Sequence, residues 1–213
     1  MTTVNKVEQI ENYLEELYPN PKCELEYSKD YELLLATMLS AQTTDKRVNQ
    51  VTRVLFRKYP SLQALKDAPR EDIEEIIKPI GTYQKKSLYV KEIATIIVDQ
   101  YGGKTPSDRK ILESLPGVGH KTVNVFLSNI YDVPAIAVDT HVERVSKRLG
   151  LAKKDDSVLA VEKKLEKYFD PSVWGRRHHQ LVLFGRYHCK SMKPECDSCK
   201  LQEICKYYKT LKK

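Results

Sequence analysis

The sequence has no long hydrophobic run, because its longest apolar stretches hold four residues, such as Leu33–Ala36. A helix that crosses a bilayer needs about 20 apolar residues, so we expect no transmembrane span. The first residues, Met-Thr-Thr-Val-Asn-Lys-Val-Glu, contain neither a basic n-region nor an apolar h-region, and a signal peptide is not expected. These absences favour a soluble intracellular protein.

Segments with the alternating pattern of β-strands are also lacking, as are low-complexity linkers and internal repeats. Apolar residues recur instead at the three- and four-residue spacing of amphipathic helices. Caps such as Thr44, Ser107 and Asp139 precede several of these stretches. The pattern predicts an all-α protein of one or two domains, with helices near residues 4–17, 30–39, 44–56, 83–101, 107–115, 123–130, 140–149 and 156–169. Shorter helices follow Ser61 and Pro69, Pro171 opens the last one, and a cysteine loop ends the fold.

Cysteine is scarce, with five in 213 residues, yet four of them form the pattern C-x6-C-x2-C-x5-C over Cys189, Cys196, Cys199 and Cys205. In an intracellular protein such clustering indicates a metal centre rather than disulfides. Structural zinc usually takes two C-x2-C pairs, and only one is present. A cubane iron–sulfur cluster accepts four thiolates from one loop, so the spacing favours iron–sulfur and leaves zinc as the alternative. Loop lysines, namely Lys190, Lys193, Lys200 and Lys206, would offset the negative charge of such a cluster.

The net charge of +7 is not spread evenly along the chain. Residues 171–213 hold ten Lys or Arg and three acids, so the rest of the chain sums to zero. This concentration suggests a polyanionic partner, although a basic tail that aids solubility explains the last residues equally well. Arg176 and Arg177 fit phosphate contacts and a solvated face equally.

Residues Leu115–Lys121, Leu-Pro-Gly-Val-Gly-His-Lys, connect two predicted helices. We expect Gly117 and Gly119 to adopt positive φ and to bring the backbone close to a ligand. The amides of Val118, Gly119 and the residues that follow would then be free donors at a helix N-terminus, which is an anion site. The anion we favour is a DNA phosphate, with Lys121 beside it; the alternative is a tight turn between helices.

Five motifs in order resemble the endonuclease III family of helix-hairpin-helix DNA glycosylases, and the resemblance covers essentially the whole chain. The motifs are Leu39-Ser-Ala-Gln-Thr-Thr-Asp45, Leu115–Lys121, Ala137-Val-Asp-Thr-His141, Gly185-Arg-Tyr-His-Cys189 and the four cysteines. The resemblance implies removal of oxidised pyrimidines and AP-lyase cleavage by β-elimination through a lysine Schiff base. It also implies a 4Fe-4S cluster, damaged or abasic double-stranded DNA as partner, a monomer, and a prokaryotic cytoplasmic location at the nucleoid.

The same resemblance assigns roles to residues. Lys121 is the implied nucleophile and Asp139 the essential carboxylate. Gln42 is the residue inserted into the DNA stack, and the DNA-binding hairpin comprises Gly117, Val118, Gly119 and His120. The cluster ligands are Cys189, Cys196, Cys199 and Cys205. The implied fold has a six-helix barrel at residues 23–133 and a discontinuous cluster domain at 1–22 and 134–213, with the DNA cleft between them.

The chemistry sets conditions on these residues. A stacked base must be extruded before it can be attacked. Lys121 must attack the sugar C1′ as a neutral amine, which burial and the positive end of the following helix would favour. Asp139 reads locally as a helix N-cap and, by resemblance, as a carboxylate that stabilises a cationic sugar. Thr82 departs from the family, whose members carry a bulky apolar wedge after Ile80-Gly81.

Two other functions remain open at this point. A monofunctional adenine mismatch glycosylase shares the hairpin, aspartate and cluster but usually lacks the lysine. A non-catalytic DNA-binding module could use the hairpin with a structural metal. Cleavage of abasic-site DNA separates these from a lyase.

Overall fold

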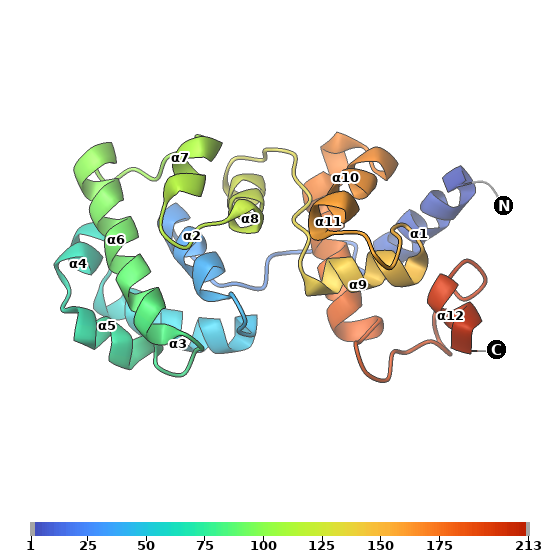
Figure 1. The fold of residues 1–213 in the computed structure, drawn as a ribbon, viewed down its shortest axis with the longest axis horizontal. Helices are drawn as coiled ribbons and strands as arrows, with labels where there is room; N and C mark the ends of the chain where they lie inside the picture. The colour runs from blue at the N-terminus through green and yellow to red at the C-terminus, as the bar shows by residue number, and fades with distance from the viewer. Residues whose placement is uncertain (1–2, 212–213) are drawn as a thin grey trace. The chain divides into compact units, whose positions relative to one another are not determined.

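The computed structural model describes residues 3–211, and no β-strand occurs in this range (Figure 1). The prediction of an all-α protein is confirmed. None of the helices in these residues is long and apolar enough to span a bilayer. Lys212 and Lys213 of the predicted basic segment lie outside the described residues.

The chain divides into two compact units. One is continuous, Cys23–Tyr131, and the other joins the segment that ends at Lys22 to the segment that begins at Asp132. Each unit has an apolar core of its own. The first core is built around α2 and the second around α9 and α11.

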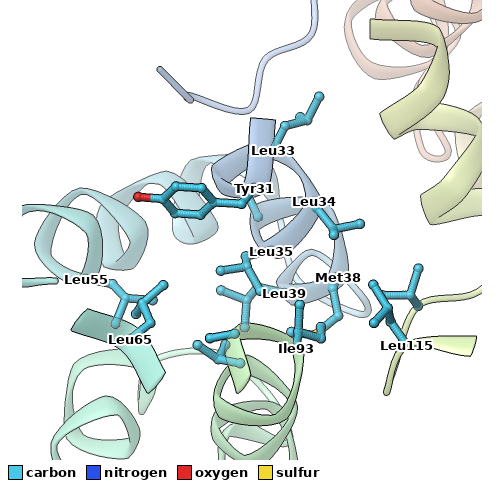
Figure 2. Packing of buried hydrophobic residues seen from close by; sticks show 14 of the residues in the cluster. Tyr31, Leu33, Leu34, Leu35, Met38, Leu39, Leu55, Leu65, Ile93 and Leu115 are labelled. Carbon is cyan, nitrogen blue, oxygen red and sulfur yellow. The ribbon is translucent and has the colours of Figure 1, made fainter. Parts of the chain in front are cut away.

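The continuous unit contains seven helices. They are α2 (Asp30–Leu39), α3 (Asp45–Lys58), α4 (Leu62–Asp67), α5 (Arg70–Ile77), α6 (Tyr83–Tyr101), α7 (Arg109–Ser114) and α8 (His120–Ile130). Helix α2 is the centre, because every residue from Tyr31 to Leu39 is buried. A helix that is apolar on all sides must be surrounded by others. Figure 2 shows Leu33, Leu35 and Met38 leaving α2 in different directions into this packing, and α2 contacts both α3 and α8.

The discontinuous unit contains α1 (Thr3–Leu17), α9 (Thr140–Leu149), α10 (Val158–Tyr168) and α11 (Trp174–Leu183). A short 3-10 helix, η1 (Pro171–Val173), precedes α11, a π-helix, η2 (Phe184–His188), follows it, and α12 (Lys206–Leu211) comes last. The expectation that the cysteine loop ends the fold is therefore wrong. Helix α11 packs against both α1 and α9.

Two arginines fasten α1 to α11. Arg177 is 6% exposed and its guanidinium pairs with Glu11 at 3.1 Å and with Glu15. Arg176 also pairs with Glu15, and these hydrogen bonds lower the pKa of the Glu15 carboxyl to about 2. Arg177 is buried and therefore not part of a solvated face, whereas the Arg176 side chain is 38% exposed; both form ion pairs within one unit.

Candidate active site and cysteine cluster

The hairpin begins with α7, whose N-cap is Asp108. Its carboxylate accepts a hydrogen bond from the Ile111 amide at 3.0 Å, so the cap lies one residue after the expected Ser107. Gly117 then adopts φ +73°, the left-handed region that favours glycine. A Cβ at Gly117 would lie 2.4 Å from the Tyr89 ring of α6. The hairpin thus packs directly on α6 at a point where only glycine fits.

Gly119 differs from Gly117. Its φ is −104° and its ψ 175°, extended backbone that any residue adopts, so the expectation of positive φ is wrong here. Gly119 is the N-cap of α8, no side chain caps this helix start, and a Cβ would meet nothing within 4 Å. The Val118 amide is not a free donor, because it bonds the Leu115 carbonyl at 3.1 Å. The donors available to an anion are therefore those that begin at the helix itself.

Lys121 is the second residue of α8 and its side chain is half-buried. Its neighbour His120 lies in a polar cluster on the same hairpin. The imidazole Nδ1 is 3.4 Å from Glu113 Oε1, and its Nε2 is 3.3 Å from Asn124 Nδ2. Because the His120 side chain is 50% exposed, one side of the ring still faces solvent next to the start of α8.

Asp139 is held as the N-cap of α9. Its Oδ1 accepts hydrogen bonds from the His141 amide at 2.9 Å and the Val142 amide at 2.8 Å. The residues before it, Ala135–Val138, are buried, and the His178 ring Nδ1 contacts the Ala137 carbonyl at 2.7 Å. Both sides of Asp139 are thus fixed, which leaves its carboxylate in one orientation.

The π-helix η2 packs against the first turn of α9. A Cβ at Gly185 would lie 2.9 Å from His141 Cβ and 3.2 Å from the His141 carbonyl oxygen. Arg144 of α9 donates to the Gly185 carbonyl at 2.6 Å. Burial lowers the pKa of the His141 imidazole. The segment that leads into Cys189 therefore contacts the turn that follows Asp139.

The four clustered cysteines line one cavity, together with apolar side chains that include Leu149 and Phe184. None of the four is paired in a disulfide. Burial raises the pKa of Cys196, and it raises that of Cys199 to about 11. Among residues 3–211 no three His, Cys, Asp or Glu side chains are grouped so as to hold a single metal ion.

Arg148, at the end of α9, holds the start of the cysteine loop. Its guanidinium donates to the Lys190 carbonyl at 2.6 Å and the Ser191 carbonyl at 2.9 Å, and one nitrogen lies 3.5 Å from Cys189 Sγ. Sequence reasoning missed Arg148, whose only signal is a basic residue in the last turn of a helix. Two of the loop lysines expected to offset cluster charge are instead paired with carboxylates, Lys190 with Glu195 at 2.6 Å and Lys200 with Glu16.

Two exposed turns of the continuous unit contain non-glycine residues with positive φ. Gln42, between α2 and α3, has φ 57°, and Thr82, just before α6, has φ 55°. Positive φ is uncommon outside glycine and is an outlier for a β-branched residue such as Thr82. Gln42 is the residue expected to enter the DNA stack, and Thr82 is the residue expected at the wedge position; both lie in exposed turns with positive φ.

Comparison with known proteins gives consistent matches. The HhH-GPD superfamily base excision DNA repair protein family matches residues 35–171. Endonuclease III of Bacillus subtilis (strain 168) is 45% identical over 206 residues, which cover 97% of this chain and 94% of that protein. Two solved structures, a trapped endonuclease III–DNA covalent intermediate in an estranged-adenine complex and a non-covalent endonuclease III–DNA complex, each match with a TM-score of 0.95 and 44% identity over 100% of both chains.

Proposed function

This chain belongs to the endonuclease III family of base excision DNA repair proteins, and we propose that it removes oxidised pyrimidines from double-stranded DNA and cuts the strand at the resulting abasic site. One observation carries the proposal: a half-buried lysine, Lys121, occupies the first turn of α8, whose N-terminus no side chain caps. A phosphate bound to those amides would hold the DNA backbone beside the amine.

Lys121 is the proposed nucleophile. Its amine forms a bond to the sugar C1′ while the bond from C1′ to the base breaks, and the base leaves with the proton that the amine gives up. The C1′–O4′ bond of the sugar ring then breaks, O4′ takes a proton, and the bond from C1′ to nitrogen becomes an iminium. Loss of a C2′ proton breaks the bond from C3′ to the phosphate oxygen, which cuts the strand.

Asp139 is the proposed electrostatic partner in the same reaction. Both amide hydrogen bonds go to its Oδ1. A carboxylate fixed by its own helix N-terminus needs no reorganisation to stabilise the cationic sugar or to assist proton transfer. Its role as a cap and its role in catalysis are therefore compatible.

We propose two kinds of DNA contact, phosphate binding by the hairpin and insertion of a side chain into the base stack. Gly117, Gly119 and His120 present the hairpin backbone and one imidazole to a phosphate, a contact that sets register but reads no sequence. The Val118 side chain is 5% exposed and belongs to the core, so its part is to hold the hairpin rather than to bind. Gln42 would enter the space left by the extruded base. We expect a monomer that acts on nucleoid DNA in the cytoplasm.

The cysteines fit the 4Fe-4S cluster that the family implies. Cys189, Cys196, Cys199 and Cys205 share one cavity with apolar walls, and the Arg148 guanidinium and the Tyr208 amide each lie 3.5 Å from a cysteine sulfur. Such N–H groups and a nearby cation suit thiolates with net negative charge. The group would supply a fixed scaffold for residues 189–205.

The decisive test of function is covalent trapping. Borohydride added during reaction with abasic-site DNA should link the DNA to Lys121. Lys121→Gln should abolish trapping and cleavage yet keep DNA affinity within about tenfold, because one contact among many is lost. Lys110→Gln, an exposed lysine on the same hairpin, is the matched control and should behave as wild type.

Three results contradict this assignment. Trapping by Lys121→Gln at the wild-type rate would mean that another amine attacks. Base release by the wild type without trapping would indicate a monofunctional glycosylase. If the wild type shows neither base release nor trapping, the chain is a DNA-binding module.

Metal analysis tests the cofactor. Anaerobically purified protein should be yellow-brown, with about four iron and four sulfide ions per chain. Cys199→Ser should lose both. Zinc without iron or visible absorption would replace the iron–sulfur assignment with the zinc alternative.

A further inference from the structure

One buried lysine, Lys86, connects the Gln42 turn to the Thr82 turn. Lys86 lies in the first turn of α6 and is 4% exposed. Its main-chain amide bonds the Thr82 carbonyl at 3.0 Å, while its ammonium donates to the Ala41 carbonyl at 2.7 Å. A single residue therefore contacts the residue next to Gln42 with one end and Thr82 with the other.

Each N–H group of the Lys86 ammonium has a neutral hydrogen-bond acceptor. Besides Ala41 it donates to the Leu39 carbonyl at 2.9 Å and lies 3.5 Å from Thr43 Oγ1, which accounts for its three N–H groups. Leu39 is the last residue of α2, where unpaired carbonyls give the helix end a partial negative charge. Burial alone lowers the pKa of Lys86. The Lys86 ammonium therefore hydrogen-bonds main-chain carbonyls rather than a carboxylate.

Few other hydrogen bonds connect the Gln42 turn to the rest of the protein. The Thr43 amide bonds the Ser40 carbonyl at 3.0 Å, and the Ser40 hydroxyl bonds the Thr37 carbonyl at 2.8 Å, both within the turn and the end of α2. A non-glycine residue at φ 57° persists only where its surroundings over-determine it. The contact with Lys86 supplies the constraint from α6.

We propose that Lys86 is a positioning residue that holds the Gln42 turn and the Thr82 turn as one rigid pair, so that the turns act together on the DNA gap opposite an extruded nucleotide. The inference rests on the proposed function, because it assumes that Gln42 enters the DNA stack. A prealigned turn loses no conformational entropy when it inserts. Lys86 therefore acts on the preference for damaged over undamaged DNA, to which a merely structural residue would contribute nothing.

The chain supplies a matched control on the same helix. Lys91 of α6 also donates to two main-chain carbonyls where a neighbouring helix ends, that of Lys66 in the last turn of α4 at 2.8 Å and that of Ala68 in the connection that follows. Its connection joins α4 to α5 and contains neither turn. Lys91→Met and Lys86→Met thus remove the same kind of contact from one helix, but only the second variant frees the Gln42 turn.

The experiment measures two dissociation constants for each variant, one for undamaged duplex and one for duplex with a tetrahydrofuran abasic analogue that cannot be cleaved. The ratio is the dissociation constant for undamaged duplex divided by that for the abasic duplex. It should fall about tenfold in Lys86→Met and in Gln42→Ala and stay within about twofold of wild type in Lys91→Met. Loss of folded protein lowers both affinities equally and leaves the ratio unchanged. If Lys86→Met does not fold, Lys86→Gln is measured in its place, because its uncharged side chain is one bond shorter and cannot reach both carbonyls.

A folded Lys86 variant with the wild-type ratio, beside a Gln42→Ala variant that loses it, overturns the proposal. So does an equal loss in Lys91→Met. If Gln42→Ala also keeps the ratio, insertion by Gln42 and the role of Lys86 fall together. Trapping at Lys121 is measured separately with the wild type and still decides the proposed function.

Discussion

At the scale of single residues, substitution can separate the observed role of Asp139 as a helix cap from its proposed role in catalysis. Asn caps helices about as well as Asp, so Asp139→Asn should change the free energy of unfolding by less than about 1 kcal/mol. It removes the charge, and base release should slow by about 10²–10³, the scale of one lost electrostatic group. Single-turnover base release and urea unfolding measure the two effects.

Asp108→Asn is the control, because Asp108 caps α7 in the same way. It should leave base release at the wild-type rate. Equal rates for Asp139→Asn and wild type would reduce Asp139 to a cap.

Other residues show which contacts a sequence can predict. The Asp139 cap follows from a side chain and the helix pattern after it, and the structure contains it. Lys86 and Arg148 were not predicted, because their partners are main-chain carbonyls far along the chain. Every residue has a carbonyl, so such a partner leaves no mark in the sequence.

At the scale of elements, the hairpin offers a matched pair of glycines. Gly117→Ala forces an L-residue to φ +73° and against Tyr89, which should destabilise the fold by about 2–4 kcal/mol. Gly119→Ala has open space and extended backbone, so its cost should be about 1 kcal/mol or less. Its methyl group stands at the uncapped start of α8, and the dissociation constant for duplex DNA should rise about tenfold.

Thermal unfolding and DNA titration of both variants check this pair. A Gly119→Ala variant with wild-type DNA affinity would contradict the phosphate site at the start of α8. A Gly117→Ala variant as stable as wild type would mean that the hairpin moves away from α6 at little cost.

Element boundaries were predictable where a local signal ends the helix. The long helix expected at 83–101 is α6, Tyr83–Tyr101, which ends before Gly102 in the left-handed region. The π-helix η2 was not predictable from the sequence. It lies where Gly185 packs on His141, and these two residues are far apart in sequence. Gly117 and Gly119 are alike in the sequence, but only Gly117 meets another helix and has positive φ.

At the scale of the whole molecule, part of the basic excess of residues 171–213 is used in ion pairs within the chain. Arg176, Arg177, Lys190 and Lys200 are paired with carboxylates of this chain. Arg186 and Lys193 come from η2 and from the cysteine loop, where Lys193 has φ 48°. These charges cannot be told apart in the sequence, because ion pairing depends on which helices contact one another.

Salt dependence of DNA binding tests which of these basic residues contact phosphate. Each phosphate neutralised contributes a slope of about −0.9 to the plot of log K against log salt for duplex DNA. Arg186→Ala and Lys193→Ala should each make the slope shallower by about that amount if they contact phosphate. Arg176→Ala should leave the slope unchanged and lower the unfolding temperature, because it removes a tie between α1 and α11. An unchanged slope in both Arg186→Ala and Lys193→Ala would place the phosphate contacts outside the cysteine-loop region, and the basic excess there would then serve the cluster and the fold.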